Sequence, residues 1–198
     1  MIPLDICGHR LVNQHLTMQK FERASEIVRL LGAVQAQDYS AAKWGIAQRT
    51  RSTTDAQVEK EINDGSILRT HVLRPTWHFV APDDIRWMLA LTAPRVKALL
   101  TFYDRKLELD APVLRRSRAV LTKALRDGKQ LTRTELSQAL TKSGISADGT
   151  QRLAHLVMHA ELDGLICSGA RRGKAVHLCA ARGTSGAGEE VEPRRGTG

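Results

Sequence analysis

The sequence lacks long hydrophobic runs and is poor in cysteine. No apolar stretch approaches the ~20 residues that span a bilayer, and the N-terminus has no basic stretch followed by an apolar one, as a secretion signal would. The three cysteines, Cys7, Cys167 and Cys179, form no Cys-x-x-Cys pair, and an odd number fits a reducing compartment better than a disulfide framework. We therefore expect a folded cytoplasmic protein with no membrane partner, in which the cysteines are small apolar core residues.

Acidic residues are scarce relative to basic ones. The 198 residues include 30 lysines and arginines against 21 acidic residues, which gives a net charge of +9 and a pI near 9.9. This balance favours a polyanionic partner, with nucleic acid ahead of an anionic membrane. The hydrophobic content of 42% is enough for a core, and the length suggests one or two small domains.

Metal-binding patterns are also sparse. The closest of the seven histidines, His155 and His159, are four residues apart on one predicted helical face, a spacing that can bind zinc. Because the sequence offers no intervening glutamate and no third ligand there, a structural or DNA-facing role is the better interpretation. We expect no metal site.

The first half of the chain predicts three helices followed by a β-hairpin. Apolar residues recur at helical spacing, a Thr54–Gln57 capping box opens the third helix, and an Arg-Pro step separates two β-favouring runs because proline cannot continue a strand ladder. The expected helices cover residues 24–34, 41–49 and 54–64, and the expected strands cover residues 66–73 and 76–80. Trp44 and Trp87, at helical positions, are expected in the core.

The second half repeats this order. A proline and two aspartates open a helical stretch over residues 82–109, and a second capping box, Thr132 with Glu135, precedes a helix that Gly144 closes. Two strands then flank a basic loop that contains glycines. The other expected helices cover residues 114–126, 132–142 and 148–163, and the strands cover residues 165–168 and 175–179.

The duplicated order predicts a mainly α fold with small β-hairpins, of the α+β class, built as tandem winged-helix domains. We expect the first winged helix in residues 1–81, a helical connector in 82–111 and the second winged helix in 112–179. Residues 180–198 are rich in glycine and charge and nearly free of large apolar side chains, so we expect a disordered tail there.

The second winged helix offers candidate DNA contacts. On its third helix an apolar stripe of Leu153, Leu156, Val157 and Ala160 faces the core, and polar side chains face outward. An ordinary solvated face, or a winged helix used for protein packing, is the alternative. The candidate DNA-binding residues are Gln151, Arg152, His155 and His159 on the helix, and Arg171, Arg172 and Lys174 on the wing.

Two glutamines are the best indication of chemistry. Gln35 and Gln37 stand one residue apart where a helix is expected to end, and in extended backbone both side chains project to one face. An amide can accept and donate hydrogen bonds but has no useful pKa, so the pair can orient a water or hold a polar ligand. Asp38, the next residue, could assist the pair as a weak base, although an aspartate after a helix end is more often a local cap.

Several segments together resemble the winged-helix crosslink-repair DNA glycosylases. The resemblance covers about residues 10–179 and rests on Arg10-Leu-Val-Asn-Gln-His-Leu, Leu31-Gly-Ala-Val-Gln-Ala-Gln-Asp, Ile67-Leu-Arg-Thr-His-Val-Leu-Arg-Pro-Thr-Trp-His-Phe-Val and Asp83-Asp-Ile-Arg-Trp-Met-Leu. It implies excision of alkylated or crosslinked purines from double-stranded DNA without metal or cofactor. It also implies that Gln35 and Gln37 are the catalytic Gln-x-Gln motif, with Asp38 as possible support.

The resemblance also directs attention to the first hairpin. Arg69, His71 and Arg74 are candidates to line a DNA-facing cleft, and His78 is equally a candidate DNA contact or a structural histidine. Trp77 and Phe79 are expected in the core. The family continues past a second winged helix with a β-rich domain, so the chain is expected to be a C-terminally truncated relative.

Two other functions remain open on the sequence alone. A non-catalytic winged-helix regulator or damage binder would use the second winged helix and its basic wing, and a protein-interaction module would show no salt-dependent DNA affinity. We expect a monomer that binds double-stranded DNA in the cytoplasm, associated with the nucleoid.

Overall fold

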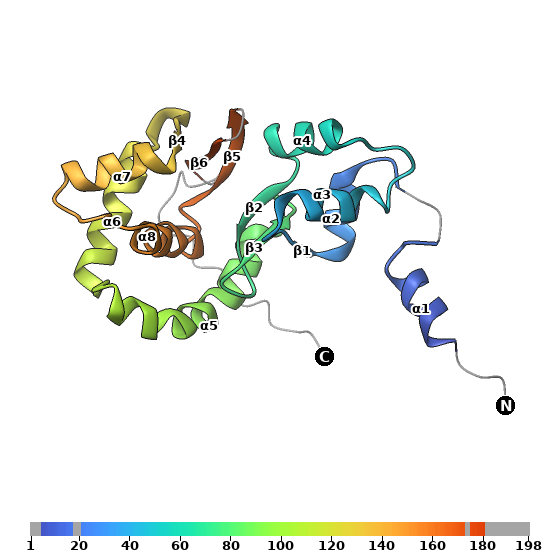
Figure 1. Ribbon diagram of the computed structural model, residues 1–198, viewed down its shortest axis with the longest axis horizontal. Coiled ribbons are helices and arrows are strands. Elements are labelled where there is room, and N and C mark those ends of the chain that lie inside the picture. The colour runs from blue at the N-terminus through green and yellow to red at the C-terminus, as the bar shows by residue number, and fades with distance from the viewer. Residues whose placement is uncertain (1–4, 18–20, 173–174, 181–198) are drawn as a thin grey trace, which may run out of the picture.

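The computed structural model describes residues 5–17, 21–172 and 175–180. The fold is mainly helical with one small antiparallel sheet, so the predicted α+β class is confirmed (Figure 1). Within these described ranges, no helix is both long and apolar enough to cross a membrane. The predicted tail lies outside the described residues except for its first residue.

Two copies of one element order follow each other along the chain, and each has the helix, strand, helix, helix, strand, strand sequence of a winged helix. The first copy comprises α2 (Ala24–Leu31), β1 (Ala33–Gln35), α3 (Tyr39–Ala47), α4 (Asp55–Asn63), β2 (Leu68–His71) and β3 (Trp77–Val80). The second comprises α6 (Ala111–Ala124), β4 (Gln130–Thr132), α7 (Arg133–Lys142), α8 (Thr150–Leu162), β5 (Ile166–Arg172) and β6 (Ala175–Ala180). Outside the copies lie α1 (Ile6–Asn13) and α5 (Ile85–Lys106), and a 3-10 turn, η1 (Arg126–Gly128), follows α6.

A single six-stranded sheet runs through both copies. The strand order is β1-β3-β2-β5-β6-β4, and every neighbouring pair is antiparallel. The two three-stranded halves join where Arg69 of β2 pairs with Ser168 of β5. The short strands β1 and β4 were not predicted, because three residues are too few to show a strand period.

Local signals explain where several helices begin and end. Both capping boxes are present: the backbone N–H of Gln57 donates to Thr54 Oγ1 at 3.3 Å, and the backbone N–H of Glu135 donates to Thr132 Oγ1 at 3.2 Å. The first predicted helix, however, ends at Leu31 and not at residue 34. Gly32 takes a φ of +73°, a left-handed conformation that suits glycine and stops the helix.

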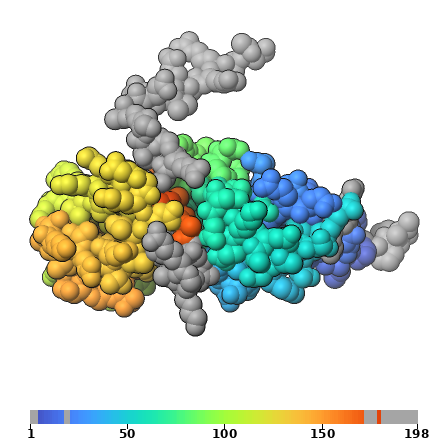
Figure 2. All heavy atoms as spheres, turned by 90° about the horizontal axis from the view of Figure 1, so that it is seen from above, coloured from blue at the N-terminus to red at the C-terminus, as the bar shows by residue number. Residues whose placement is uncertain are grey.

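Three apolar clusters form the core, and one of them joins the two halves. One lies inside the first winged helix around Ile27, Ile46 and Phe79, and another lies inside the second around Leu121 and Leu156. The third joins the long helix α5 to β2, β3, α8 and β5. In the space-filling view the first copy (blue to teal) and the second (yellow to orange) form two adjoining lobes (Figure 2).

The core prediction is wrong for two tryptophans and one cysteine. Trp44 is 66% exposed and Trp87 is 52% exposed, while Cys7 is exposed on α1. On α3 the buried positions are Ala42, Lys43 and Ile46, which leaves Trp44 on the outer side. Trp87 lies off the buried face of α5, and its indole N–H donates to Asp84 at 2.8 Å. Trp77 and Phe79 are buried as predicted.

Candidate active site

Gln35 and Gln37 project from extended backbone to the same side of the chain. Gln35 is the last residue of β1 and pairs with His78 of β3. Ala36 between the glutamines is fully buried, and its amide donates to the Trp77 carbonyl at 2.7 Å, whereas both glutamines are exposed. The expected common face is therefore present, although it arises from a strand and not from a helix end.

The first hairpin fixes the oxygen of each glutamine amide. Arg74 Nη2 donates to Gln35 Oε1 at 2.7 Å, and the Trp77 backbone amide donates to Gln37 Oε1 at 3.4 Å. A carbonyl oxygen has two lone pairs, so each oxygen can still accept a hydrogen from a water or a ligand. Arg74 is exposed, and it is the predicted cleft residue that the structure brings to the glutamines.

Both glutamines and Asp38 line one open pocket of about 710 Å³. The walls come from the end of α2, from β1, from α3 and from the segment after α1. Arg49 closes one side, because its guanidinium donates to the Gln14 carbonyl at 2.8 Å and to the Gly45 carbonyl at 2.5 Å. The pocket is thus an open cleft in which apolar side chains line much of the wall, beside the two exposed glutamines.

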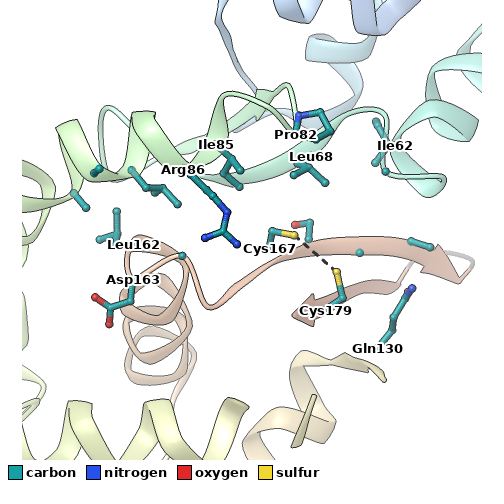
Figure 3. A pocket seen from close by; sticks show the side chains of 18 of the residues that line it. Ile62, Leu68, Pro82, Ile85, Arg86, Gln130, Leu162, Asp163, Cys167 and Cys179 are labelled. Atoms are coloured by element: carbon teal, nitrogen blue, oxygen red, sulfur yellow. Dashed lines mark hydrogen bonds between the residues drawn. The ribbon is translucent and has the colours of Figure 1, made fainter. Parts of the chain in front are cut away.

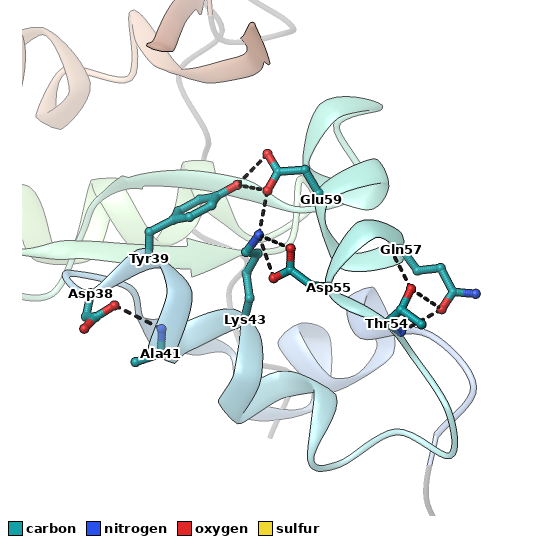
Figure 4. Close-up of polar contacts among 8 residues, drawn as sticks. All are labelled: Asp38, Tyr39, Ala41, Lys43, Thr54, Asp55, Gln57 and Glu59. Carbon is teal, nitrogen blue, oxygen red and sulfur yellow. Dashed lines mark hydrogen bonds and ion pairs between the residues drawn. The ribbon is translucent and has the colours of Figure 1, made fainter. Parts of the chain in front are cut away.

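Asp38 has a structural role at the edge of this pocket. It is the N-cap of α3, and its carboxylate accepts the Ala41 backbone amide at 3.0 Å (Figure 4). This is the local cap that the sequence favoured over a catalytic base. The cap sets the direction in which α3 leaves the glutamine segment and forms the pocket wall.

An ionic cluster around the buried side chain of Lys43 anchors α3 to α4. Lys43 Nζ contacts Asp55 and Glu59 at 2.8 Å each, and the Tyr39 hydroxyl donates to Glu59 at 3.0 Å (Figure 4). Burial alone would lower the pKa of Lys43, but the hydrogen bonds and charges of the two carboxylates outweigh it and raise that pKa. Lys43 is therefore a charged tether, which nothing in its sequence position indicated.

Arg69 lies behind the glutamines and not in a DNA-facing cleft. It is buried, and its Nε and Nη2 donate to the Ala36 carbonyl at 3.2 and 2.8 Å. The guanidinium carbon is 4.3 Å from the Trp77 ring centroid and 5.4 Å from that of Tyr39. The prediction of a cleft residue is wrong, because the extended segment needs a donor for the buried carbonyl between its glutamines.

The two hairpin histidines are also buried. His71 pairs with the fully buried Glu161 of α8 and packs on the Trp77 ring, so it joins the two winged helices and does not line a cleft. Burial raises the pKa of Glu161, against the opposing effect of His71. For His78, burial lowers the pKa, and its Nδ1 lies 3.0 Å from the Thr76 carbonyl, which supports the structural alternative.

The outward face predicted on α8 is wrong for its histidines. Helix α5 packs along α8. The carboxylate of Asp104 on α5 lies 3.1 Å from His155 Nδ1 and 2.9 Å from His159 Nε2, within hydrogen-bond distance of both. Arg152 is likewise occupied, since its side chain donates to the carbonyls of Ser146 and Leu107. Gln151 is exposed.

The wing differs from the predicted loop. Residues 171 and 172 continue β5 and pair with β6, so the hairpin is longer than expected. The side chains of Arg171 and Arg172, and the whole of Lys174, lie outside the described part of the structure. Within the described residues, no group of three or more histidine, cysteine or acidic side chains is arranged to hold a metal ion.

Sequence reasoning missed the residues that build the pocket around the glutamines. Gln14 and Arg49 meet although they are 35 residues apart, and no spacing pattern links them. The role of Arg69 had one available signal, a charged residue within a β-favouring run.

Comparisons with known proteins identify the family of the chain. Residues 28–194 match the family described as DNA glycosylase AlkZ-like. An interstrand DNA cross-link repair glycosylase from Streptomyces sahachiroi is 28% identical over 174 residues, which is 84% of this chain and 46% of that protein. The solved structure of Streptomyces sahachiroi DNA glycosylase AlkZ superposes with a TM-score of 0.78 at 25% identity, covering 93% of this chain and 51% of that one. The chain therefore spans about half the length of these relatives, and it belongs to the AlkZ-like DNA glycosylase family.

Proposed function

We propose that this chain carries the catalytic motif of a monofunctional DNA glycosylase that hydrolyses the N-glycosidic bond of N7-alkylated or crosslinked purines in double-stranded DNA. The observation that carries the proposal is the geometry of Gln35 and Gln37, whose amide oxygens lie on one side of an extended segment at an open pocket. Family membership and the named activity of the Streptomyces sahachiroi relative support the substrate class.

The chemistry suits two uncharged amides. Alkylation at N7 makes the purine cationic, so the base can leave from C1′ without a strong acid. The remaining task is to place water against an oxocarbenium-like sugar and to stabilise its positive charge. Two amide oxygens can accept both hydrogens of that water and face the charge, whereas an unalkylated purine keeps a poor leaving group and is spared.

Neighbouring residues act on the glutamines in this proposal. Arg74 and the Trp77 amide orient the two oxygens, and Arg69 holds the carbonyl of the intervening Ala36. These are positioning residues. Asp38 supports the site as the cap of α3 and is not required as a base.

DNA contact is proposed for exposed or wing residues and not for the face of α8. Arg74 at the pocket and the wing residues Arg171, Arg172 and Lys174 are the candidates, and the net charge of +9 supports a phosphate-binding surface. The packing of α5 against α8 occupies His155 and so disfavours the alternative function, a regulator that reads DNA through this helix face. We propose that the protein acts as a monomer on DNA in the cytoplasm.

An excision assay on a duplex with a single N7-methylguanine tests the proposal. Wild-type protein is expected to leave an abasic site on this duplex and none on the same duplex with guanine. Gln37→Ala should abolish most of the product, and Gln138→Ala, which removes an exposed glutamine on α7, should leave it unchanged. Equal product from both variants, or no abasic site with wild-type protein, would contradict the proposal.

A further inference from the structure

Two cysteines face each other in the sheet where the winged helices join. Cys167 of β5 and Cys179 of β6 are direct antiparallel partners, and their Sγ atoms are 3.8 Å apart (Figure 3). The Cα atoms of opposed residues in antiparallel strands are about 4.5–5.5 Å apart. Disulfides span Cα distances of roughly 4.4–6.8 Å, so side-chain rotation is enough to close a bond here.

A pocket of about 430 Å³ brings reagents to this pair. One wall comes from α4, β2 and the start of α5, and the opposite wall comes from the end of α8 and from β5 (Figure 3). Cys167 is buried in the apolar cluster between the winged helices, and Cys179 is partly buried against the same cluster. A small reagent entering the pocket therefore meets both sulfur atoms together.

We propose that Cys167 and Cys179 form a dithiol site that reacts with oxidants of the hydroperoxide class and closes to a disulfide. Two S–H bonds and the O–O bond of the peroxide break, and one S–S bond forms. The sulfurs are oxidised, the peroxide oxygens are reduced, and the two thiol hydrogens leave in water and, for an organic peroxide, in the alcohol. The site lies apart from the glutamine pocket and does not depend on glycosylase activity.

The chain provides an internal control in Cys7. This third cysteine is exposed on α1, in the segment before the first winged helix, and it does not line the pocket. General thiol oxidation would affect the exposed Cys7 first. A pair-specific reaction must link the two sheet cysteines to each other and leave Cys7 out.

Peptide mapping of the native protein tests the proposal. The protein is treated with one equivalent of hydrogen peroxide, blocked with iodoacetamide and digested with trypsin. Trypsin cuts at Arg171, Arg172 and Lys174, so the two cysteine peptides separate unless a disulfide joins them. The expected result is a joined pair of peptides that dithiothreitol releases. Separately alkylated peptides, or a link from either cysteine to Cys7, would overturn the proposal.

Two further measurements keep the test independent of folding defects. Cys7→Ser should retain the linked peptides, and Cys167→Ser should lose them with an unchanged circular dichroism spectrum. In unoxidised wild-type protein, phenylarsine oxide replaces its oxygen by two As–S bonds and releases water, so one equivalent should protect both cysteines from iodoacetamide. Alkylation of both cysteines at the untreated rate would also overturn the proposal.

Discussion

Replacing Arg69 by methionine tests how the glutamine segment is held. The substitution keeps an apolar stem between Trp77 and Tyr39 but removes both hydrogen bonds to the Ala36 carbonyl. Because Ala36 lies between the two glutamines, loss of this anchor should loosen the positions of both amides. The expected result is a fall in stability together with a larger fall in excision rate.

The size of the stability loss follows from the contacts of the guanidinium. Hydrogen bonds from a charged donor contribute about 1.5–3 kcal/mol, and both bonds here reach one acceptor, so we count them once. Cation–π contact with a buried ring contributes about 1–2 kcal/mol. Release of a buried charge offsets part of the sum. We expect a net loss of about 1–3 kcal/mol, which lowers Tm by roughly 2–4 °C per kcal/mol in a protein of this size.

Thermal unfolding and single-turnover excision are measured on the same preparations. The rate should fall by about 10- to 100-fold at a temperature where the variant is fully folded, because displacement of a positioning group by 1 Å can cost about 100-fold. Arg95→Met, which changes an exposed arginine on α5, is the matched control. An Arg69→Met protein that unfolds and excises like the control would refute the role assigned to Arg69.

Substitutions at two further positions probe electrostatics and capping. Because burial raises the pKa of Glu161, the folded protein binds the carboxyl proton more tightly than the unfolded chain does. Binding of this proton therefore stabilises the fold fully below the ordinary pKa of 4.5, and the stabilisation is lost as pH rises through the raised pKa. Glu161→Gln cannot ionise, so urea unfolding between about pH 4 and pH 8 should show a flatter profile than wild type. Asp38→Ala should lower stability by about 1 kcal/mol through loss of the α3 cap, whereas Asp38→Asn should keep both stability and excision, and loss of excision in the asparagine variant would instead identify a base.

Local sequence signals predicted the elements that depend on a few neighbouring residues. The two capping boxes act within one helical turn, so their effects could be predicted without tertiary information. The glycine after α2 is an equally local signal, but the predicted helix ran past it to residue 34. Strands β1 and β4 depend on pairing with β3 and β6, which are far away in the chain. Each of these strands has three residues, which are too few to show a strand pattern, so only their pairing in the sheet identifies them.

The same distinction separates the glutamines from the other candidate residues. Their common face follows from local extended backbone, and the structure places both in one pocket. His155 lies on a helical face that periodicity placed opposite the core of its own domain. Periodicity could not show that α5 returns to cover that face and supplies Asp104. Trp44 was expected in the core, but the buried positions of α3 include Lys43, whose ammonium pairs with Asp55 and Glu59 of α4, a contact that the sequence spacing does not show.

The most direct test of the central claim separates DNA binding from chemistry in the double variant Gln35→Ala/Gln37→Ala. Binding to a duplex with one N7-methylguanine and the single-turnover rate of base excision are measured beside Gln138→Ala. If the two amides position the attacking water, the rate should fall by about 100-fold or more while the Kd stays within about threefold of the control. An excision rate equal to that of the control would contradict the account.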